Sequence, residues 1–289
     1  MLCDICPRGC KIDRDNKLGF CGVSSNVKLA KTDVFMWEEP CISGTKGSGA
    51  IFFSGCNLKC CFCQNYQISS GGIGKEISVE RLAEIFKELE SKGVHNINLV
   101  SPSHYTNQII SALKLYRPKV PIVWNSNGYE KVETIEKLKD FIDIFLVDLK
   151  FYDEELSEKY CKAKNYFCFA SKAILKMLEY KPKPVLENEI LKNGVIIRHL
   201  VMPNCTEDSI TILNWLSNIK NSKFLISIMG QYTPCFNSSK FPEINRPLKP
   251  VEYKVVVNKA KQLKLTDGYI QELDSCGEDF IPIWDFKGV

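Results

Sequence analysis

Three cysteines within one short stretch are the residues of this sequence best placed to do chemistry. Cys56, Cys60 and Cys63 form the spacing C-x3-C-x2-C. They follow the apolar run Ala50–Ser54, which we expect to be a buried strand, and Gly55 lets the backbone approach a bound group closely. Three thiolates at this spacing can bind three irons of a [4Fe–4S] cluster, and the fourth iron then keeps an open coordination position. The pattern therefore predicts a reactive iron–sulfur cluster.

A zinc knuckle is the alternative reading of these cysteines. Zinc motifs usually pair two C-x2-C elements, and they seldom follow directly on a buried strand. In barrels and open α/β sheets, ligands bind at the carboxyl ends of the strands, which is where this motif lies. Cys61 stands between the ligand positions and is expected to point away from the metal. The iron–sulfur reading is therefore favoured.

A second group of cysteines precedes the first. Cys3, Cys6, Cys10 and Cys21 form the spacing C-x2-C-x3-C-x10-C. Four thiolates suit a closed site, either structural zinc or a second iron–sulfur cluster, and the metal would stabilise a segment that has almost no core of its own. Cys41 is a candidate extra or alternative ligand. Disulfides are the competing explanation, and a reducing compartment argues against them.

The composition is that of an ordinary globular protein, with 45 % hydrophobic and 25 % charged residues in 289. Nine of the fourteen cysteines fall in the first 63 residues, and this clustering indicates metal binding. The remaining five are expected to be small buried apolar residues. They are Cys161, Cys168, Cys205, Cys235 and Cys276.

Charge and hydropathy indicate where the protein is located and which partners it is not expected to bind. The net charge of +4 is spread along the chain without a basic block, so nucleic-acid binding is not expected. No apolar run approaches the roughly 18 residues that a membrane span needs. The first residues lack the apolar run of a signal peptide. We therefore expect a cytoplasmic protein that does not bind membranes.

From residue 48 onward, short apolar runs alternate with amphipathic stretches. Continuous apolar strands between helices are typical of a parallel sheet. Six such units are too few for a closed eight-fold barrel, so the predicted fold is α/β, a partial (β/α)6 parallel barrel over residues 48–289. A small Cys-rich metal-binding segment, residues 1–47, precedes it. The expected strands after the first are 97–100, 120–124, 142–147, 194–201 and 224–229, and the expected helices are 79–92, 107–116, 132–138, 154–160, 171–180, 209–219 and 251–263.

With Phe62 before its last cysteine, the central motif resembles the signature of the radical S-adenosylmethionine (SAM) superfamily, C-x3-C-x-aromatic-C after the first barrel strand. This resemblance implies that SAM binds the open iron through its amino and carboxylate groups, with its adenine near Phe62. A low-potential donor of the flavodoxin or ferredoxin type would reduce the cluster, and cleavage of SAM would release a 5′-deoxyadenosyl radical. Within the superfamily the chain is most similar to activating enzymes of glycyl-radical proteins, in a branch resembling pyruvate formate-lyase activating enzyme. The segments that carry this likeness are 38–44, 63–66, 198–200 and 231–234.

The same resemblance assigns further residues to the SAM site. Ser101, Pro102 and Ser103 end the second strand where the family usually has a Gly-Gly-Glu, which is absent here. Asn125 stands where activating enzymes have an Asp, which leaves a cation site there in doubt. Asp148, Lys150 and Arg198 match strand-end residues of the cofactor pocket, and Arg198 is also costly to bury without an anionic partner. The candidate catalytic residues are His104, Gln231 and Tyr232, each of which could instead be structural.

Three functions remain open at this point. The first is a radical enzyme that abstracts hydrogen from a protein or peptide, with glycine as the leading target. The second is a radical enzyme acting on a small molecule. The third is an iron–sulfur electron-transfer or metal-carrier protein, which three cysteines disfavour because an electron carrier usually has four protein ligands per cluster.

Overall fold

The computed structural model describes residues 2–271, 273 and 282–289. Ten strands form one sheet in the order β10-β9-β8-β6-β5-β4-β2-β1-β3, with β7 paired to β8. The strands are β1 (Val27–Phe35), β2 (Ser48–Phe53), β3 (Lys75–Ile77), β4 (Ile97–Val100), β5 (Ile122–Ser126), β6 (Ile144–Asp148), β7 (Val185–Glu187), β8 (Ile190–Leu200), β9 (Leu225–Met229) and β10 (Gly268–Ile270). Of the five cysteines expected to be buried apolar residues, Cys161 and Cys205 are buried and Cys235 is partly buried. The expectation is wrong for Cys168, which is exposed. Cys276 lies outside the described residues.

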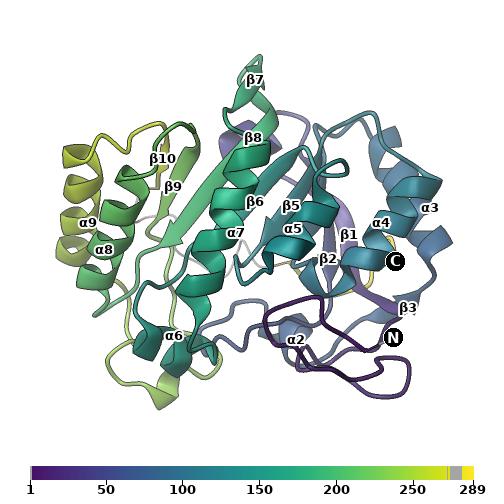
Figure 1. Ribbon diagram of the computed structural model, residues 1–289, viewed down its shortest axis with the longest axis horizontal. Coiled ribbons are helices and arrows are strands. Elements are labelled where there is room, and N and C mark those ends of the chain that lie inside the picture. The colour runs from purple at the N-terminus through teal and green to yellow at the C-terminus, as the bar shows by residue number, and fades with distance from the viewer. Residues whose placement is uncertain (1, 272, 274–281) are drawn as a thin grey trace.

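The longer helices follow the strands and cover one face of the sheet (Figure 1). They are α3 (Val79–Ser91), α4 (Thr106–Leu115), α5 (Val132–Leu138), α6 (Glu154–Cys161), α7 (Tyr166–Tyr180), α8 (Thr206–Ser217) and α9 (Pro250–Gln262). Two short helices are α1 (Pro40–Ser43) and α2 (Tyr66–Ser69). The predicted partial (β/α)6 barrel is confirmed, because six strands run parallel to one another in the order β2, β4, β5, β6, β8 and β9. None of the helices among the described residues is long and apolar enough to cross a membrane.

Local sequence explains the helix ends. The Ser78 side chain accepts a hydrogen bond from the backbone amide of Arg81 at 3.1 Å, which caps α3 as the sequence predicts. Apolar residues at helical spacing, among them Leu82, Ile85 and Phe86, bury one face of this helix against the sheet. The amphipathic pattern therefore fixes both the start of α3 and its packing.

Alternation along the parallel strands separates two layers of side chains. On β6, Phe145 and Val147 pack in the large cluster beneath the helices, while Ile144 and Leu146 lie in a smaller cluster inside the curve of the sheet. Asp148, next on the inner side, lines a cavity. The inner face therefore changes from apolar to polar toward the carboxyl ends of the strands.

Four strands were not expected from the sequence. β1 pairs antiparallel with β2 and extends the sheet from within residues 1–47, and β3 continues it at the edge. β7 forms a hairpin with β8 that projects from the sheet (Figure 1), and β10 adds a parallel strand beside β9. β3, β7 and β10 have only three residues each, too few for a clear pattern.

Candidate active site

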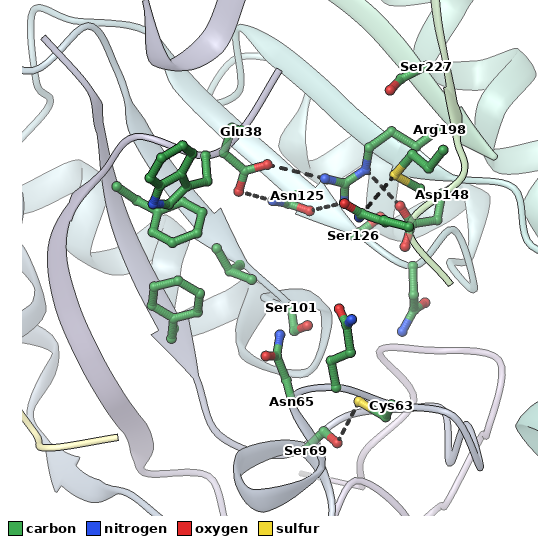
Figure 2. Close-up of a pocket in the computed structure, with 18 of the residues that line it drawn as sticks. Glu38, Cys63, Asn65, Ser69, Ser101, Asn125, Ser126, Asp148, Arg198 and Ser227 are labelled. Atoms are coloured by element: carbon green, nitrogen blue, oxygen red, sulfur yellow. Dashed lines mark hydrogen bonds and ion pairs between the residues drawn. The ribbon is translucent and has the colours of Figure 1, made fainter. Parts of the chain in front are cut away.

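A cavity of about 550 Å³ lies inside the curve of the sheet and reaches the carboxyl ends of the parallel strands. Its lining includes Cys56, Cys60 and Cys63 from the loop after β2, and polar residues from β5, β6 and β8. Figure 2 shows this cavity, with Cys63 on one side and Glu38 on the other. Thiols and charged groups far apart in the sequence therefore line one cavity.

The loop that carries the cysteines packs closely on neighbouring segments. Gly55 has φ +85°, and a Cβ there would lie 2.8 Å from the carbonyl oxygen of Cys21. The amide of Cys56 donates to this same carbonyl at 3.3 Å. Two further amides, of Lys59 and Cys61, donate to carbonyls at the end of α6, at 3.1 and 2.8 Å. Glycine is required at position 55 because both φ and the close approach exclude a side chain.

Each of the three cavity-lining sulfurs has at least one polar side chain beside it. The amide nitrogen Nδ2 of Asn127 donates to the sulfur of Cys56 at 3.3 Å. The sulfur of Cys161 lies 3.2 Å from that of Cys60, and the hydroxyl of Ser69 lies 3.3 Å from the sulfur of Cys63. These partners come from the β5–α5 loop, the end of α6, and α2. Hydrogen bonds of this kind orient metal ligands and adjust their basicity.

The donor set of this loop suits a cluster. Three cysteines can bind three irons of a [4Fe–4S] cubane and leave the fourth iron open. Among the residues that the structure describes, no three His, Cys, Asp or Glu side chains are already grouped around one metal-ion position, either at this loop or at the N-terminal cysteines. The donor set is therefore compatible with a [4Fe–4S] cluster.

Cys61, between these cysteines, packs in the hydrophobic core and is absent from the cavity lining. Its carbonyl accepts a hydrogen bond from the amide of Asn237 at 2.8 Å. Burial raises the pKa of the Cys61 thiol to about 12, so the side chain stays protonated. The structure thus places it where the sequence predicts, pointing away from the other three sulfurs.

A network of charged side chains forms the other side of the cavity (Figure 2). Arg198 Nε donates to Asp148 Oδ1 at 2.8 Å, and Nη2 donates to Asn125 Oδ1 at 2.6 Å. Lys150 Nζ lies 2.7 Å from Asp148 Oδ2. Arg198 Nη1 also reaches Glu38 Oε2 at 3.2 Å. The anionic partners that burial of Arg198 demands are therefore carboxylates of the protein itself.

Burial and pairing shift the pKa values of this network in different directions. Burial alone would raise the pKa of Asp148, but Arg198 and Lys150 hold it below its usual range. For Glu38, burial outweighs the attraction of Arg198 and raises the pKa to about 7. Burial alone would lower the pKa values of Lys150 and Arg198, but the neighbouring carboxylates raise both. Asp148 is thus ionised at neutral pH, whereas Glu38 sits near its midpoint.

Comparison with known proteins identifies the family. Residues 50–216 match the family model described as "Radical SAM superfamily". The chain belongs to the radical SAM superfamily. Enzymes of this superfamily use a [4Fe–4S] cluster together with SAM and require a reductant.

Individual relatives agree with this membership. The chain is 32 % identical to an uncharacterized protein of Methanocaldococcus jannaschii, over 91 % of this chain and 75 % of that one. It is 25 % identical to the pyruvate formate-lyase-activating enzyme of Clostridium pasteurianum, over 77 % of this chain and 90 % of the relative. Among solved structures, methylornithine synthase (PylB) superposes with a TM-score of 0.53 at 16 % identity, over 89 % of this chain and 66 % of that one. The fold is therefore that of a radical SAM enzyme.

Of the residues expected to bind SAM, five line the cavity. They are Ser101, Asn125, Asp148, Lys150 and Arg198. Ser101 has a positive φ of 57° at the end of β4. Pro102 and Ser103 are not in the lining, and Ser103 instead donates to buried Glu130 at 2.5 Å. Phe62, within the cysteine loop, is buried and is also absent from the lining. The centre of its ring lies 6.0 Å from the centre of the Tyr232 ring.

The three candidate catalytic residues separate in space. Gln231 lines the cavity. The hydroxyl of Tyr232 is buried and donates to the carbonyl of Ile244 at 2.8 Å. The His104 ring is buried outside the cavity, 2.8 Å from the carbonyl of Ser54, and burial lowers its pKa to about 3. These positions favour structural roles for Tyr232 and His104.

The four N-terminal cysteines lie in a loop segment beside the cysteine loop (Figure 1). A Cβ at Gly19 would lie 3.2 Å from the sulfur of Cys21 and 3.8 Å from that of Cys10. The sulfurs of Cys10 and Cys21 therefore both lie close to Gly19. Cys41, the candidate extra or alternative ligand, is instead buried in α1 among Val123 and other residues inside the barrel. It therefore lies apart from the segment that carries the other four.

Proposed function

We propose that this chain binds a [4Fe–4S] cluster through Cys56, Cys60 and Cys63 and SAM beside it, and that it abstracts hydrogen from a protein or peptide. The observation that carries the proposal is the convergence of these three thiols, with no fourth cysteine among the described lining residues, on a cavity that charged residues also line. When bound, the cluster and SAM together supply a carbon-centred radical.

The chain's own residues have three tasks in this proposal. Asn127, Cys161 and Ser69 orient the sulfurs through their hydrogen bonds. Lys150 and Asp148 offer a cation and an anion to the polar groups of SAM, and both are held in place by their mutual contact. The surrounding sheet and helices limit access of water, which would otherwise quench a radical.

A protein or peptide substrate is supported by the likeness to pyruvate formate-lyase-activating enzyme, and glycine is the leading target on that ground. A small molecule remains the second candidate, because a cavity of about 550 Å³ is within the usual size range of small-molecule sites. An electron-transfer or metal-carrier role is disfavoured, since such proteins usually provide four cysteines to each cluster.

The proposal also includes an electron donor and a second metal site. One is a low-potential electron donor of the flavodoxin or ferredoxin type. The other is a second metal site at Cys3, Cys6, Cys10 and Cys21, holding zinc or iron–sulfur. The hydrogen bond from the amide of Cys56 to the carbonyl of Cys21 joins this segment to the cluster loop. A metal in the segment would therefore also stabilise the loop.

The test uses anaerobically reconstituted protein with dithionite and SAM. Slow release of 5′-deoxyadenosine is expected, and substitution of the three cysteines should abolish it. Adding either the macromolecular or the low-molecular-weight fraction of a cell extract then decides the substrate class. Faster release with only the macromolecular fraction supports the proposal. Faster release with the low-molecular-weight fraction alone would contradict the proposal and indicate a small-molecule substrate.

A further inference from the structure

Two adjacent glutamates, Glu38 and Glu39, reach the cavity from the end opposite the cysteines. Phe35, the last residue of β1, pairs with Ser48, the first residue of β2. The chain after β1 therefore emerges at the amino ends of the parallel strands, whereas the cysteine loop follows their carboxyl ends. Figure 2 accordingly shows Glu38 and Cys63 on opposite sides of the cavity. We call Glu38 and Glu39 the floor carboxylates.

The two floor carboxylates differ in how well they are paired. Glu38 Oε1 accepts hydrogen bonds from Asn98 at 2.9 Å and from Asn125 at 3.1 Å, and Oε2 accepts one from Arg198. Glu39 is only 9 % exposed, yet its Oε2 is buried without a hydrogen-bond partner among the described residues. The nearest cation to it is Arg198, at 3.9 Å. A buried carboxylate in this state is costly unless a ligand supplies a donor.

The charges of the described cavity lining do not balance. Three carboxylates, Glu38, Glu39 and Asp148, face two cations, Lys150 and Arg198. Asp148 contacts both cations closely, and Arg198 divides its remaining donors between Asn125 and Glu38. Glu39 is therefore the carboxylate left without a close counter-ion. Burial is the main cause that raises the pKa of Glu38, and the neighbouring Glu39 raises it further.

We propose that the floor carboxylates form the recognition site for a positively charged group of the substrate, an ammonium such as that of a lysine side chain. The inference rests on the proposed function, since it assumes a substrate that enters this cavity. The assignment concerns the free oxygen of Glu39, and not Asn125 and Arg198, which the resemblance gives to SAM. Glu39 Oε2, which is buried and has no partner among the described residues, accepts the ammonium.

The experiment compares two probes that differ only in the ammonium group. Nα-acetyl-lysine methylamide and its norleucine counterpart share backbone and apolar stem. Their binding to reconstituted, SAM-loaded protein is followed by saturation-transfer NMR. The lysine probe should bind saturably and the norleucine probe about tenfold more weakly or not at all. Equal binding of the two, or binding of neither, would overturn the proposal.

Variants locate the binding. Glu39→Gln keeps the shape and removes the charge, and it should weaken the lysine probe by about tenfold without affecting the norleucine probe. Glu130→Gln is the matched control, because Glu130 is fully buried but does not line the cavity. Unchanged lysine binding in Glu39→Gln would also overturn the proposal. SAM cleavage without added substrate, measured in parallel, tests the proposed function separately, because it does not require the floor to be occupied.

Discussion

The sulfur of Cys161, the last residue of α6, lies 3.2 Å from the sulfur of Cys60, although 101 positions separate the two residues. The carbonyl of Cys161 also accepts a hydrogen bond from the amide of Lys59 at 3.1 Å. The end of α6 therefore supports the cysteine loop through both backbone and side chain. We infer that the Cys161 thiol donates to the Cys60 thiolate when a cluster is bound.

Replacing Cys161 with Ala should lower the midpoint potential of the cluster. A hydrogen bond to a ligand sulfur disperses negative charge and so favours the reduced cluster, and its removal reverses this effect. The measurement is a redox titration followed by electron paramagnetic resonance. Cys161→Ser keeps a donor and should lie between the wild type and the Ala variant. Cys205→Ala is the control, since Cys205 is a buried thiol that does not line the cavity.

A potential in Cys161→Ala that matches both the wild type and Cys205→Ala would contradict the assigned hydrogen bond. The potential is the informative quantity, because SAM cleavage could fall merely from a loosened loop. Iron content should stay unchanged in all three variants.

The four neighbouring cysteines of the loop should divide into two classes. Cys56→Ala, Cys60→Ala and Cys63→Ala should each lose this cluster's iron and the release of 5′-deoxyadenosine. Cys61→Ala should keep both, because Cys61 packs in the core, and it should cost about 1 kcal/mol of unfolding free energy. Iron analysis, visible absorption and chemical denaturation measure these effects. An inactive but folded Cys61→Ala protein would falsify the ligand assignment.

The N-terminal cysteines should bind metal independently of the cavity. Protein carrying alanine at Cys56, Cys60 and Cys63 should still contain either about one zinc or about four irons. Removing Cys3 and Cys6 as well should eliminate this metal and make the segment before β1 sensitive to proteolysis. Elemental analysis of both proteins decides between zinc and iron. If the first variant contains neither, the second site does not exist.

Much of the fold could be predicted because it is encoded locally. The helix 132–138 and the strand 97–100 have the predicted bounds, since periodicity and turn residues act within a few positions. β1 was missed because it lies among the Cys-rich turns and pairs with an irregular register between Leu29 and Lys31. Its partner strand β2 is far more apolar, so only β2 gave a clear signal.

The candidate site also contains residues that local sequence predicts and residues that only folding brings together. The spacing of Cys56, Cys60 and Cys63 is a local signal. Only folding brings Cys161 to Cys60 and Asn127 to Cys56, and the second contact spans 71 positions. Glu38 was part of a family-like segment, but its contact with Arg198 spans 160 positions and depends on β1, which was not predicted. Long-range contacts of this kind leave no pattern in a single sequence.

His104, a candidate catalytic residue, is expected to contribute to stability in a pH-dependent way. The folded protein keeps this ring neutral, because burial lowers its pKa to about 3. The positive charges of Arg14 and Lys59 also lower this pKa, whereas the hydrogen bond with Ser54 raises it. In the unfolded chain a histidine has a pKa of about 6.5. The unfolded state therefore takes up a proton first as the pH falls. The contribution is complete above about pH 6.5 and is lost below it.

The expected size of this effect is about 1.4 kcal/mol between pH 7.5 and pH 5.5, since one proton binds the unfolded chain alone. His104→Gln should be less stable than the wild type at pH 7.5, because a buried ring is lost. Between pH 7.5 and pH 5.5, its free energy of unfolding should decrease by about 1.4 kcal/mol less than that of the wild type. His95→Gln is the control, because the His95 ring is less buried and should change the slope less. Urea unfolding at the two pH values measures both quantities. SAM cleavage should persist in folded His104→Gln, and its complete loss at an unchanged cluster content would restore His104 as a catalytic candidate.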